Sequence, residues 1–93
     1  MKEFSKVFTI KNKLGLHARA AAVFVRTSSK FLSDVKLLKD GYEVNGKSIL
    51  GVLSLAAITG SQVQVITSGT DSEQAIKTIE DLIESGFGEG IEE

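Results

Sequence analysis

The stretch VKLLKDGYEV, residues 35–44, decides the fold class of this 93-residue chain. Its two apolar-rich halves are joined by Asp40-Gly41, a dipeptide suited to the positive backbone dihedrals of a two-residue hairpin turn. The stretch therefore predicts a β-hairpin with strands at 35–39 and 42–44. Because a hairpin pairs its strands antiparallel, we expect the sheet that contains it to be largely antiparallel.

Further elements flank the hairpin on both sides. Residues 4–10 are typical of a strand with Phe8 and Ile10 on one face and Thr9 on the other, and residues 62–67 alternate apolar and polar side chains, as half-buried strands do. Apolar residues recur at helical spacing over residues 17–29, and a brief amphipathic stretch follows Ser48, which stands where a helix N-cap would. A last helix opens at residues 70–73. The order strand, helix, strand, strand, short helix, strand, helix predicts an α+β fold with the helices packed on one face of the sheet.

The last helix has its own start and stop signals. Thr70 and Glu73 have the spacing of a capping box, in which each side chain bonds a backbone N–H near the other. Gly86 is a natural helix stop. The apolar stripe between these signals consists of Ala75, Ile76, Ile79, Leu82 and Ile83. Residues 86–93 are rich in glycine and glutamate, and we expect them to form a mobile tail.

Composition describes one small domain, residues 1–93, with 42% hydrophobic and 25% charged residues. The absence of cysteine excludes disulfides, thiolate catalysis and cysteine-based metal sites. No cofactor-binding motif is present, so we expect neither a cofactor nor a metal. The apolar runs are too short to span a bilayer and the N-terminus lacks a signal-peptide core, so cytoplasmic residence is the expectation.

Charge is distributed unevenly along the chain. Residues 1–70 carry a net charge of +6 and residues 71–93 a net charge of -7. The basic side chains in the sequence neighbourhood of the two candidate sites are Lys11, Lys13, Arg19, Arg26 and Lys47. They predict a locally positive face for an acidic partner, although a mixed solvated surface is the alternative. Few aromatic residues and an acidic pI of about 5.8 disfavour a nucleic-acid surface.

His17 is the only histidine, and it lies where a polar turn becomes a helix. The first N–H groups of a helix lack intrahelical partners and carry partial positive charge. They favour a neutral, nucleophilic imidazole at that position and would also bind a phosphate attached to it. Arg19 could contribute a guanidinium to the same oxygens. The residues alone leave two alternatives open, since His17 could be a surface helix cap without function and Arg19 a solvated helix residue.

The chain lacks the parts of a self-sufficient phosphotransferase. It has no Walker-type glycine loop, no kinase signature and no cluster of magnesium-binding carboxylates near His17. The pattern therefore indicates a protein that receives and donates a phosphoryl group, rather than one that hydrolyses a nucleotide.

Two separated motifs resemble one family. GLHAR at residues 15–19 and NGKSILGVLSL at residues 45–55 are similar to those of HPr, the histidine-containing phosphocarrier of the bacterial sugar phosphotransferase system. The resemblance extends over almost the whole chain. It implies an open-faced β-sandwich with four antiparallel strands and three helices on one face. It also implies that phosphoenolpyruvate-charged enzyme I phosphorylates Nδ1 of His17, that Arg19 and the amide of Ala18 attend the phosphate, and that the histidine of an EIIA domain receives it.

The resemblance also assigns roles around Ser48. Many members are phosphorylated at this serine by an HPr kinase/phosphorylase, whereas the alternative is an ordinary N-cap. The resemblance further implies a docking patch for enzyme I and EIIA, with a small interface that suits rapid release. Its candidate residues are Ala22, Lys47, Ile49, Leu50 and Leu53. Periodicity alone assigns the last three of them mostly to the core.

One residue departs from the family pattern: Ala20 stands where the family usually has proline directly after the arginine. Alanine preserves the helix and adds an N–H, so transfer rate or partner choice is affected rather than the fold. The change could mark a regulatory paralogue of a nitrogen-linked or catabolite-control branch, which docks on transcriptional regulators according to its phosphorylation state. The retained pair of His17 and Arg19 favours a phosphoryl carrier, which we expect to be monomeric.

Overall fold

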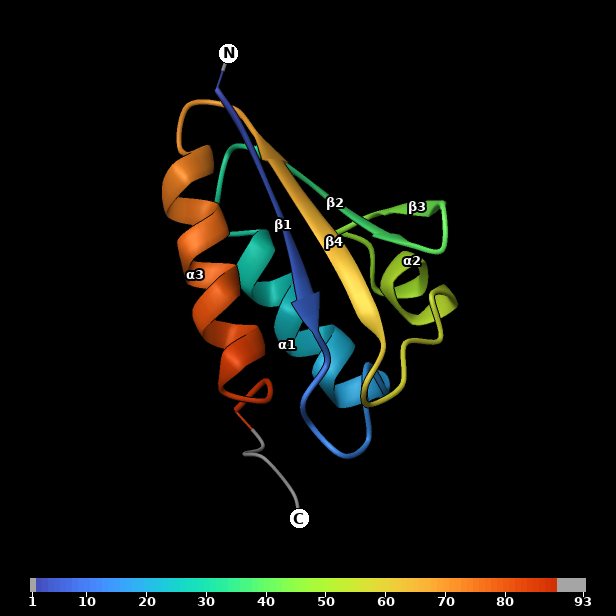
Figure 1. The fold of residues 1–93 in the computed structure, drawn as a ribbon. Helices are drawn as coiled ribbons and strands as arrows, with labels where there is room; N and C mark the ends of the chain where they lie inside the picture. Colours follow the sequence, from blue (N-terminus) through green and yellow to red (C-terminus); the bar gives the residue numbers. More distant parts are fainter. Residues whose placement is uncertain (1, 89–93) are drawn as a thin grey trace.

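The computed structural model describes residues 2–88. Strands and helices follow one another in the predicted order (Figure 1). The elements are β1 (Glu3–Thr9), α1 (Ala18–Ser28), β2 (Asp34–Lys39), β3 (Tyr42–Asn45), α2 (Ile49–Ser54), β4 (Gln62–Ser68) and α3 (Ser72–Glu84). Within residues 2–88, no helix is both long enough and apolar enough to cross a membrane.

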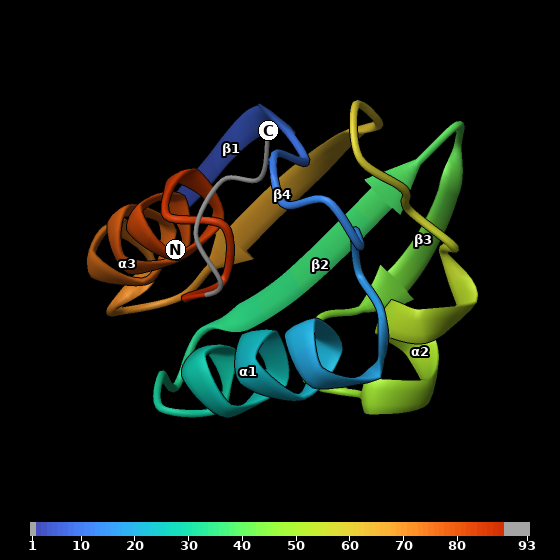
Figure 2. The same cartoon turned by 90° about the horizontal axis from the view of Figure 1, so that it is seen from below.

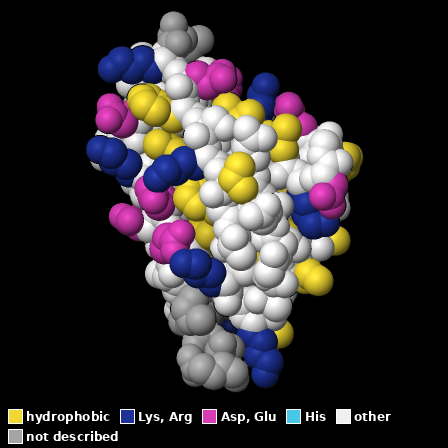
Figure 3. All heavy atoms as spheres, in the orientation of Figure 1, with side chains coloured by type: hydrophobic (Ala, Val, Ile, Leu, Met, Phe, Trp, Pro, Cys, Tyr) yellow, Lys and Arg dark blue, Asp and Glu magenta, His cyan; other side chains and the backbone are white. Residues whose placement is uncertain are grey.

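The four strands form one antiparallel sheet in the order β1-β4-β2-β3. All three helices lie on one side of this sheet, and the other side is uncovered (Figure 2). The predicted α+β open-faced sandwich is therefore confirmed. Figure 3 looks onto the uncovered side, where small apolar patches are scattered among uncharged polar atoms and the charged side chains gather toward the margins.

The hairpin that the sequence predicts joins β2 to β3. Asp40 and Gly41 have φ values of 53° and 81°, as a tight turn with two left-handed residues requires. Lys39 pairs with Tyr42, and Leu37 pairs with Val44 two residues further from the turn. Leu37 and Val44 are both buried against the helices, so the turn and the apolar pattern specify the same register.

The core lies between the sheet and the helices. Alternate residues of β4 and β2 are buried in it, and α1 and α3 contribute the predicted stripes. The largest fully buried side chains are Phe24, Ile10, Leu37, Ile79, Ile83, Val35, Val52, Val63 and Val65. Burial of these faces holds α1 and the loop before it in place against the sheet.

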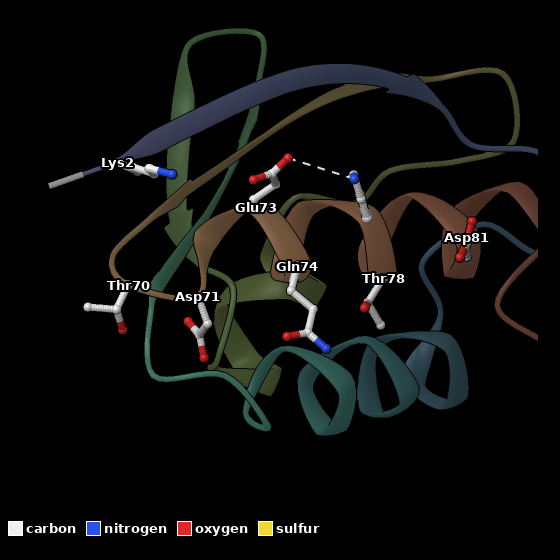
Figure 4. A pocket seen from close by; sticks show the side chains of 8 residues that line it. Lys2, Thr70, Asp71, Glu73, Gln74, Thr78 and Asp81 are labelled. Atoms are coloured by element: carbon white, nitrogen blue, oxygen red, sulfur yellow. Dashed lines mark ion pairs between the residues drawn. The ribbon is translucent and has the colours of Figure 1, made fainter.

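The predicted capping box of α3 is wrong. The N-cap residue is Asp71 rather than Thr70, and its side chain makes no cap hydrogen bond. The Asp71 carboxylate instead accepts hydrogen bonds from Ser33 Oγ–H (2.5 Å), Ser33 N–H (2.9 Å) and Leu32 N–H (2.9 Å). In Figure 4, Thr70 and Glu73 point apart. Glu73 forms an ion pair with Lys77, with 3.7 Å between the charged atoms. Three donors from a distant loop outcompete the local cap.

The bonds to Asp71 also determine its protonation. The Ser33 hydroxyl and, second, the Leu32 amide lower the pKa of the Asp71 carboxyl, because they stabilise its charged form. The carboxylate thus joins the start of α3 to the segment that follows α1.

Gly86 ends α3 as predicted, with φ of 71°. Gly86 N–H donates to Ile83 O (3.0 Å) and Phe87 N–H donates to Leu82 O (2.9 Å), which is the Schellman pattern. The expectation of a mobile tail over residues 86–93 is wrong for Phe87, whose side chain is 3% exposed and belongs to the core. The left-handed turn at Gly86 reverses the chain and returns this aromatic ring to the apolar interior. The rest of the predicted tail, residues 89–93, lies outside the described residues.

Candidate functional site

His17 is the N-cap residue of α1, with extended backbone dihedrals (φ -77°, ψ -177°). Its side chain is half-buried, and its Nδ1 accepts a hydrogen bond of 3.3 Å from Arg19 N–H. The first helical backbone bond runs from Ala21 N–H to His17 O (2.8 Å). Because Nδ1 is the acceptor, a neutral imidazole here carries its proton on Nε2. The nucleophilic nitrogen therefore faces the amides of the first helical turn.

The loop before His17 is braced from both sides. Leu16 N–H donates to Ala57 O (2.9 Å), which fastens the loop to the segment between α2 and β4. The side chain of fully buried Asn12 donates from Nδ2 to Gly15 O (2.8 Å), and the Asn12 backbone carbonyl accepts from Gly15 N–H (3.2 Å). Asn12 belongs to the polar turn before His17, and its residue type alone did not predict this role. Its buried amide holds the residues that lead into the histidine.

Gly15 is required by both its conformation and its surroundings. Its φ is +67°, a value that side chains with a Cβ rarely adopt. A Cβ at this position would lie 2.4 Å from Ala57 O and 2.9 Å from Ile58 Cα, and both are backbone atoms. The loop that carries His17 thus approaches the segment after α2 more closely than any other residue type would permit.

Arg19 and Ala18 are exposed residues of the same helical turn, which places both beside His17. The predicted positive face is less extensive than the basic residues suggested. Lys11 forms an ion pair with Glu84 of α3, and Lys47 Nζ donates to Phe31 O (2.7 Å) beyond the C-terminal end of α1. Arg19 is therefore the basic residue that the fold brings to the histidine through its own helical turn.

Ser48 is the N-cap of α2, as predicted, and its Oγ accepts from Gly51 N–H (3.1 Å). Ser28 Oγ donates to Gly46 O (2.6 Å), so the segment before α2 is fastened to the last turn of α1. Ser28 lies eleven residues after His17, which is about 16 Å along a helix. Gly46, two residues before Ser48, is therefore joined to the end of α1 opposite to His17.

Three of the predicted docking residues, Ile49, Leu50 and Leu53, belong to α2. Ile49 and Leu50 are 45% and 80% exposed, so the alternative that places them in the core is wrong. Val52 takes the buried position of this helix instead, and Leu53, Ala22 and Lys47 are half-buried. With only six residues, α2 buries one narrow side, Leu53 packs against its edge, and Ile49 and Leu50 are left in solvent.

Two further apolar side chains were missed by the sequence reading. Leu14 and Ile58 are both exposed, and they belong to the two segments that meet at Gly15. They border the loop that carries His17. A leucine within an otherwise polar turn was the one signal that could have revealed this rim.

The family model described as the phosphorylation site of the HPr component of the phosphotransferase system matches residues 4–85. The chain belongs to the HPr family. It is 48% identical to the phosphocarrier protein HPr of Neisseria meningitidis over 81 residues, which cover 87% of this chain and 91% of that protein. A crystal structure of HPr from Thermoanaerobacter tengcongensis superposes with a TM-score of 0.88 at 52% identity, covering 98% of this chain and all of that one.

Membership in the HPr family makes this chain a phosphocarrier of the phosphotransferase system and implies that it interacts with the enzymes of that system. The HPr-like protein Crh of Bacillus subtilis is also similar, with 47% identity over 75% of this chain and 82% of its own length. A solution structure of that protein superposes with a TM-score of 0.64. The weaker match favours the carrier over the regulatory paralogue.

Proposed function

We propose that His17 is the residue that carries the phosphoryl group, and that its Nδ1 is the acceptor atom. The observation that carries this proposal is the 3.3 Å hydrogen bond between Nδ1 and Arg19 N–H. It orients the unprotonated nitrogen toward the amides at the start of α1, where the helix dipole favours an anion. A phosphoryl group bound to Nδ1 would occupy this position.

The transfer step requires little from the carrier itself. The bond between phosphorus and the donor atom of phospho-enzyme I breaks, and its electron pair stays on the enzyme. The lone pair of His17 Nδ1 forms the new N–P bond. The amides of Ala18 and Arg19 and the Arg19 guanidinium donate hydrogen bonds to the phosphate oxygens. The reverse arrangement passes the group to the histidine of an EIIA domain. Each partner supplies the remaining catalytic groups.

The exposed side of α2 is the proposed docking surface for both partners. Ile49 and Leu50 offer exposed apolar area, and the other proposed contact residues, Leu53, Ala22 and Lys47, are half-buried. A small apolar contact suits a carrier that must release each partner quickly. We place this single-domain carrier in the cytoplasm as a monomer.

Incubation with purified enzyme I and phosphoenolpyruvate tests the acceptor. We expect one acid-labile phosphoryl group, detected by intact mass, and none in a His17→Ala variant. Lys30→Ala changes an exposed side chain after the end of α1 and serves as the control, with labelling equal to that of the unmodified protein. Full labelling of His17→Ala would overturn the proposal.

A second candidate function is regulation through phosphorylation of Ser48. Its hydroxyl caps α2 by accepting from Gly51 N–H, so a phosphate on Oγ would lie at the amides of that helix. The added negative charge would border exposed Ile49 and Leu50, and we expect it to weaken docking there.

The regulatory role is tested with an HPr kinase and ATP, followed by mapping of the modified residue. We expect modification at Ser48 and slower phosphoryl transfer from enzyme I. Ser54, an exposed serine of the same helix, provides the comparison. The Ser54→Ala variant should be phosphorylated at Ser48 to the same extent as the protein without a substitution. Absence of phosphate at Ser48 would remove the regulatory role.

A further inference from the structure

The first turn of α1 contains a backbone donor that has no acceptor among residues 2–88. The amides of Ala18, Arg19 and Ala20 precede the first helical bond, which is made by Ala21 N–H to His17 O. Arg19 N–H is bonded to His17 Nδ1. Within residues 2–88, Ala20 N–H makes no hydrogen bond to backbone or side chain.

Ala20 is also completely buried, with 0% of its surface exposed. Its N–H therefore has neither water nor a protein acceptor among the described residues. Unsatisfied buried N–H groups are rare in folded proteins, because each costs free energy comparable to a lost hydrogen bond. This isolated donor is one residue from the amide that His17 Nδ1 already uses.

Helix geometry directs the Ala20 N–H toward His17. Side chains at an N-cap accept hydrogen bonds from the second or the third residue of the helix, which are Arg19 and Ala20 here. In the unphosphorylated protein, His17 uses the second position at 3.3 Å, a long distance for an N–H···N bond. The third position remains for another acceptor atom at the same helix end.

Phosphorylation of Nδ1 changes which atoms can accept. The lone pair of Nδ1 is then used in the N–P bond, so Arg19 N–H must turn to a phosphate oxygen. The phosphoryl group brings three oxygens that each accept hydrogen bonds, so it can use a further backbone donor beside those of Ala18 and Arg19. We infer that the backbone N–H of Ala20 donates a hydrogen bond to the phosphoryl group on His17 and is a positioning group of the carrier reaction. The inference depends on the proposed phosphorylation of His17.

The donor exists because residue 20 is not proline. Proline, which the sequence reading gave as the usual family residue here, has no N–H and cannot make this bond. The phosphorylated state of this chain thus gains one charge-assisted hydrogen bond that a proline at position 20 would lack. The equilibrium of phosphoryl transfer between enzyme I and this carrier should therefore lie further toward the phosphorylated carrier than it would with proline at position 20.

Amide NMR of the protein without any substitution, recorded before and after phosphorylation, tests the inference directly. In a sample shown by mass to be phosphorylated at His17, we expect the Ala20 amide proton to move downfield together with that of Arg19. An unchanged Ala20 resonance in that sample would overturn the inference and leave the carrier function standing. Failure to phosphorylate His17 at all would instead refute the proposed function.

The Ala20→Pro variant tests the energetic consequence. A hydrogen bond to a charged group is worth about tenfold or more in an equilibrium constant, so the phosphoryl equilibrium with enzyme I should shift about tenfold toward phospho-enzyme I. Ile79→Val is the control for lost stability, because it removes a methylene from a buried residue of α3. We expect its phosphoryl equilibrium with enzyme I to be unchanged. Equal equilibrium constants for Ala20→Pro and the unmodified protein would contradict the inference. If Ala20→Pro does not fold, the NMR result decides alone.

Discussion

Replacing Gly15 by alanine should destabilise the protein far more than the same replacement at Gly41. Both glycines have left-handed φ values, +67° and +81°, which cost alanine about 1–2 kcal/mol. At Gly41 a new Cβ meets nothing within 4 Å, so no further cost arises. At Gly15 it would lie 2.4 Å from Ala57 O, and the two segments must separate.

Separation breaks the 2.9 Å hydrogen bond from Leu16 N–H to Ala57 O. Because Leu16 is buried, the lost bond and its unsatisfied partners cost about 1–3 kcal/mol more. We therefore expect Gly15→Ala to lower the free energy of unfolding by about 2–5 kcal/mol and Gly41→Ala by about 1–2 kcal/mol.

Urea unfolding followed by circular dichroism measures both values. A typical small domain has about 5–15 kcal/mol of stability, so both variants should remain folded enough to compare. Losses that agree within about 0.5 kcal/mol would refute the reasoning, since strain at φ would then account for both and the close approach at Gly15 would contribute nothing.

Three further changes have defined outcomes. Ala56 has φ of 50° although it is not glycine, so Ala56→Gly should raise the free energy of unfolding by about 0.5–1 kcal/mol in urea, and a loss would contradict this. Hydrogen bonds lower the pKa of Asp71 in the folded state, so its stabilising contribution should be present above about pH 4 and disappear as pH falls through the folded pKa. Asp71→Asn should therefore flatten the acid side of a melting-temperature profile, and an unaltered profile would argue against the role of the charge. Because Arg19 is exposed, Arg19→Ala should slow phosphoryl transfer from enzyme I about tenfold without changing the melting temperature, and unchanged transfer rates would show that the amides suffice.

Features that depend on neighbouring residues could be predicted from the sequence. The hairpin follows from Asp40-Gly41 and the apolar residues beside it, and the N-cap at Ser48 follows from residue type. The helix start at His17 follows from its position between a polar turn and an apolar pattern. These signals are contained within one or two turns of chain. The element order and the site motifs were therefore accessible without coordinates.

Features that depend on distant residues were not accessible. Asp71 bonds Ser33 across 38 positions, and nothing near Thr70 signals that a loop will supply those donors. The burial of Phe87 depends on the reversal at Gly86 and on space left in the core. The close approach of Gly15 to Ala57 likewise requires the packing of two loops. Such contacts are decided by tertiary structure, which local propensity does not record.

The exposure of Ile49 and Leu50 lies between these two cases. Their spacing alone could describe a core stripe, and the short length of α2 decides otherwise, since only Val52 faces fully inward. The resemblance to a family of carriers correctly anticipated an exposed patch where periodicity did not.

The position of the phosphate on the imidazole tests the central claim most directly. The account holds that Nδ1 of His17, which faces the first turn of α1, is the atom that accepts the phosphoryl group. Phosphorus and nitrogen NMR of the protein labelled by enzyme I and phosphoenolpyruvate distinguishes the two ring nitrogens. We expect an N–P bond at Nδ1. Phosphate on Nε2, or on a residue other than His17, would contradict the account.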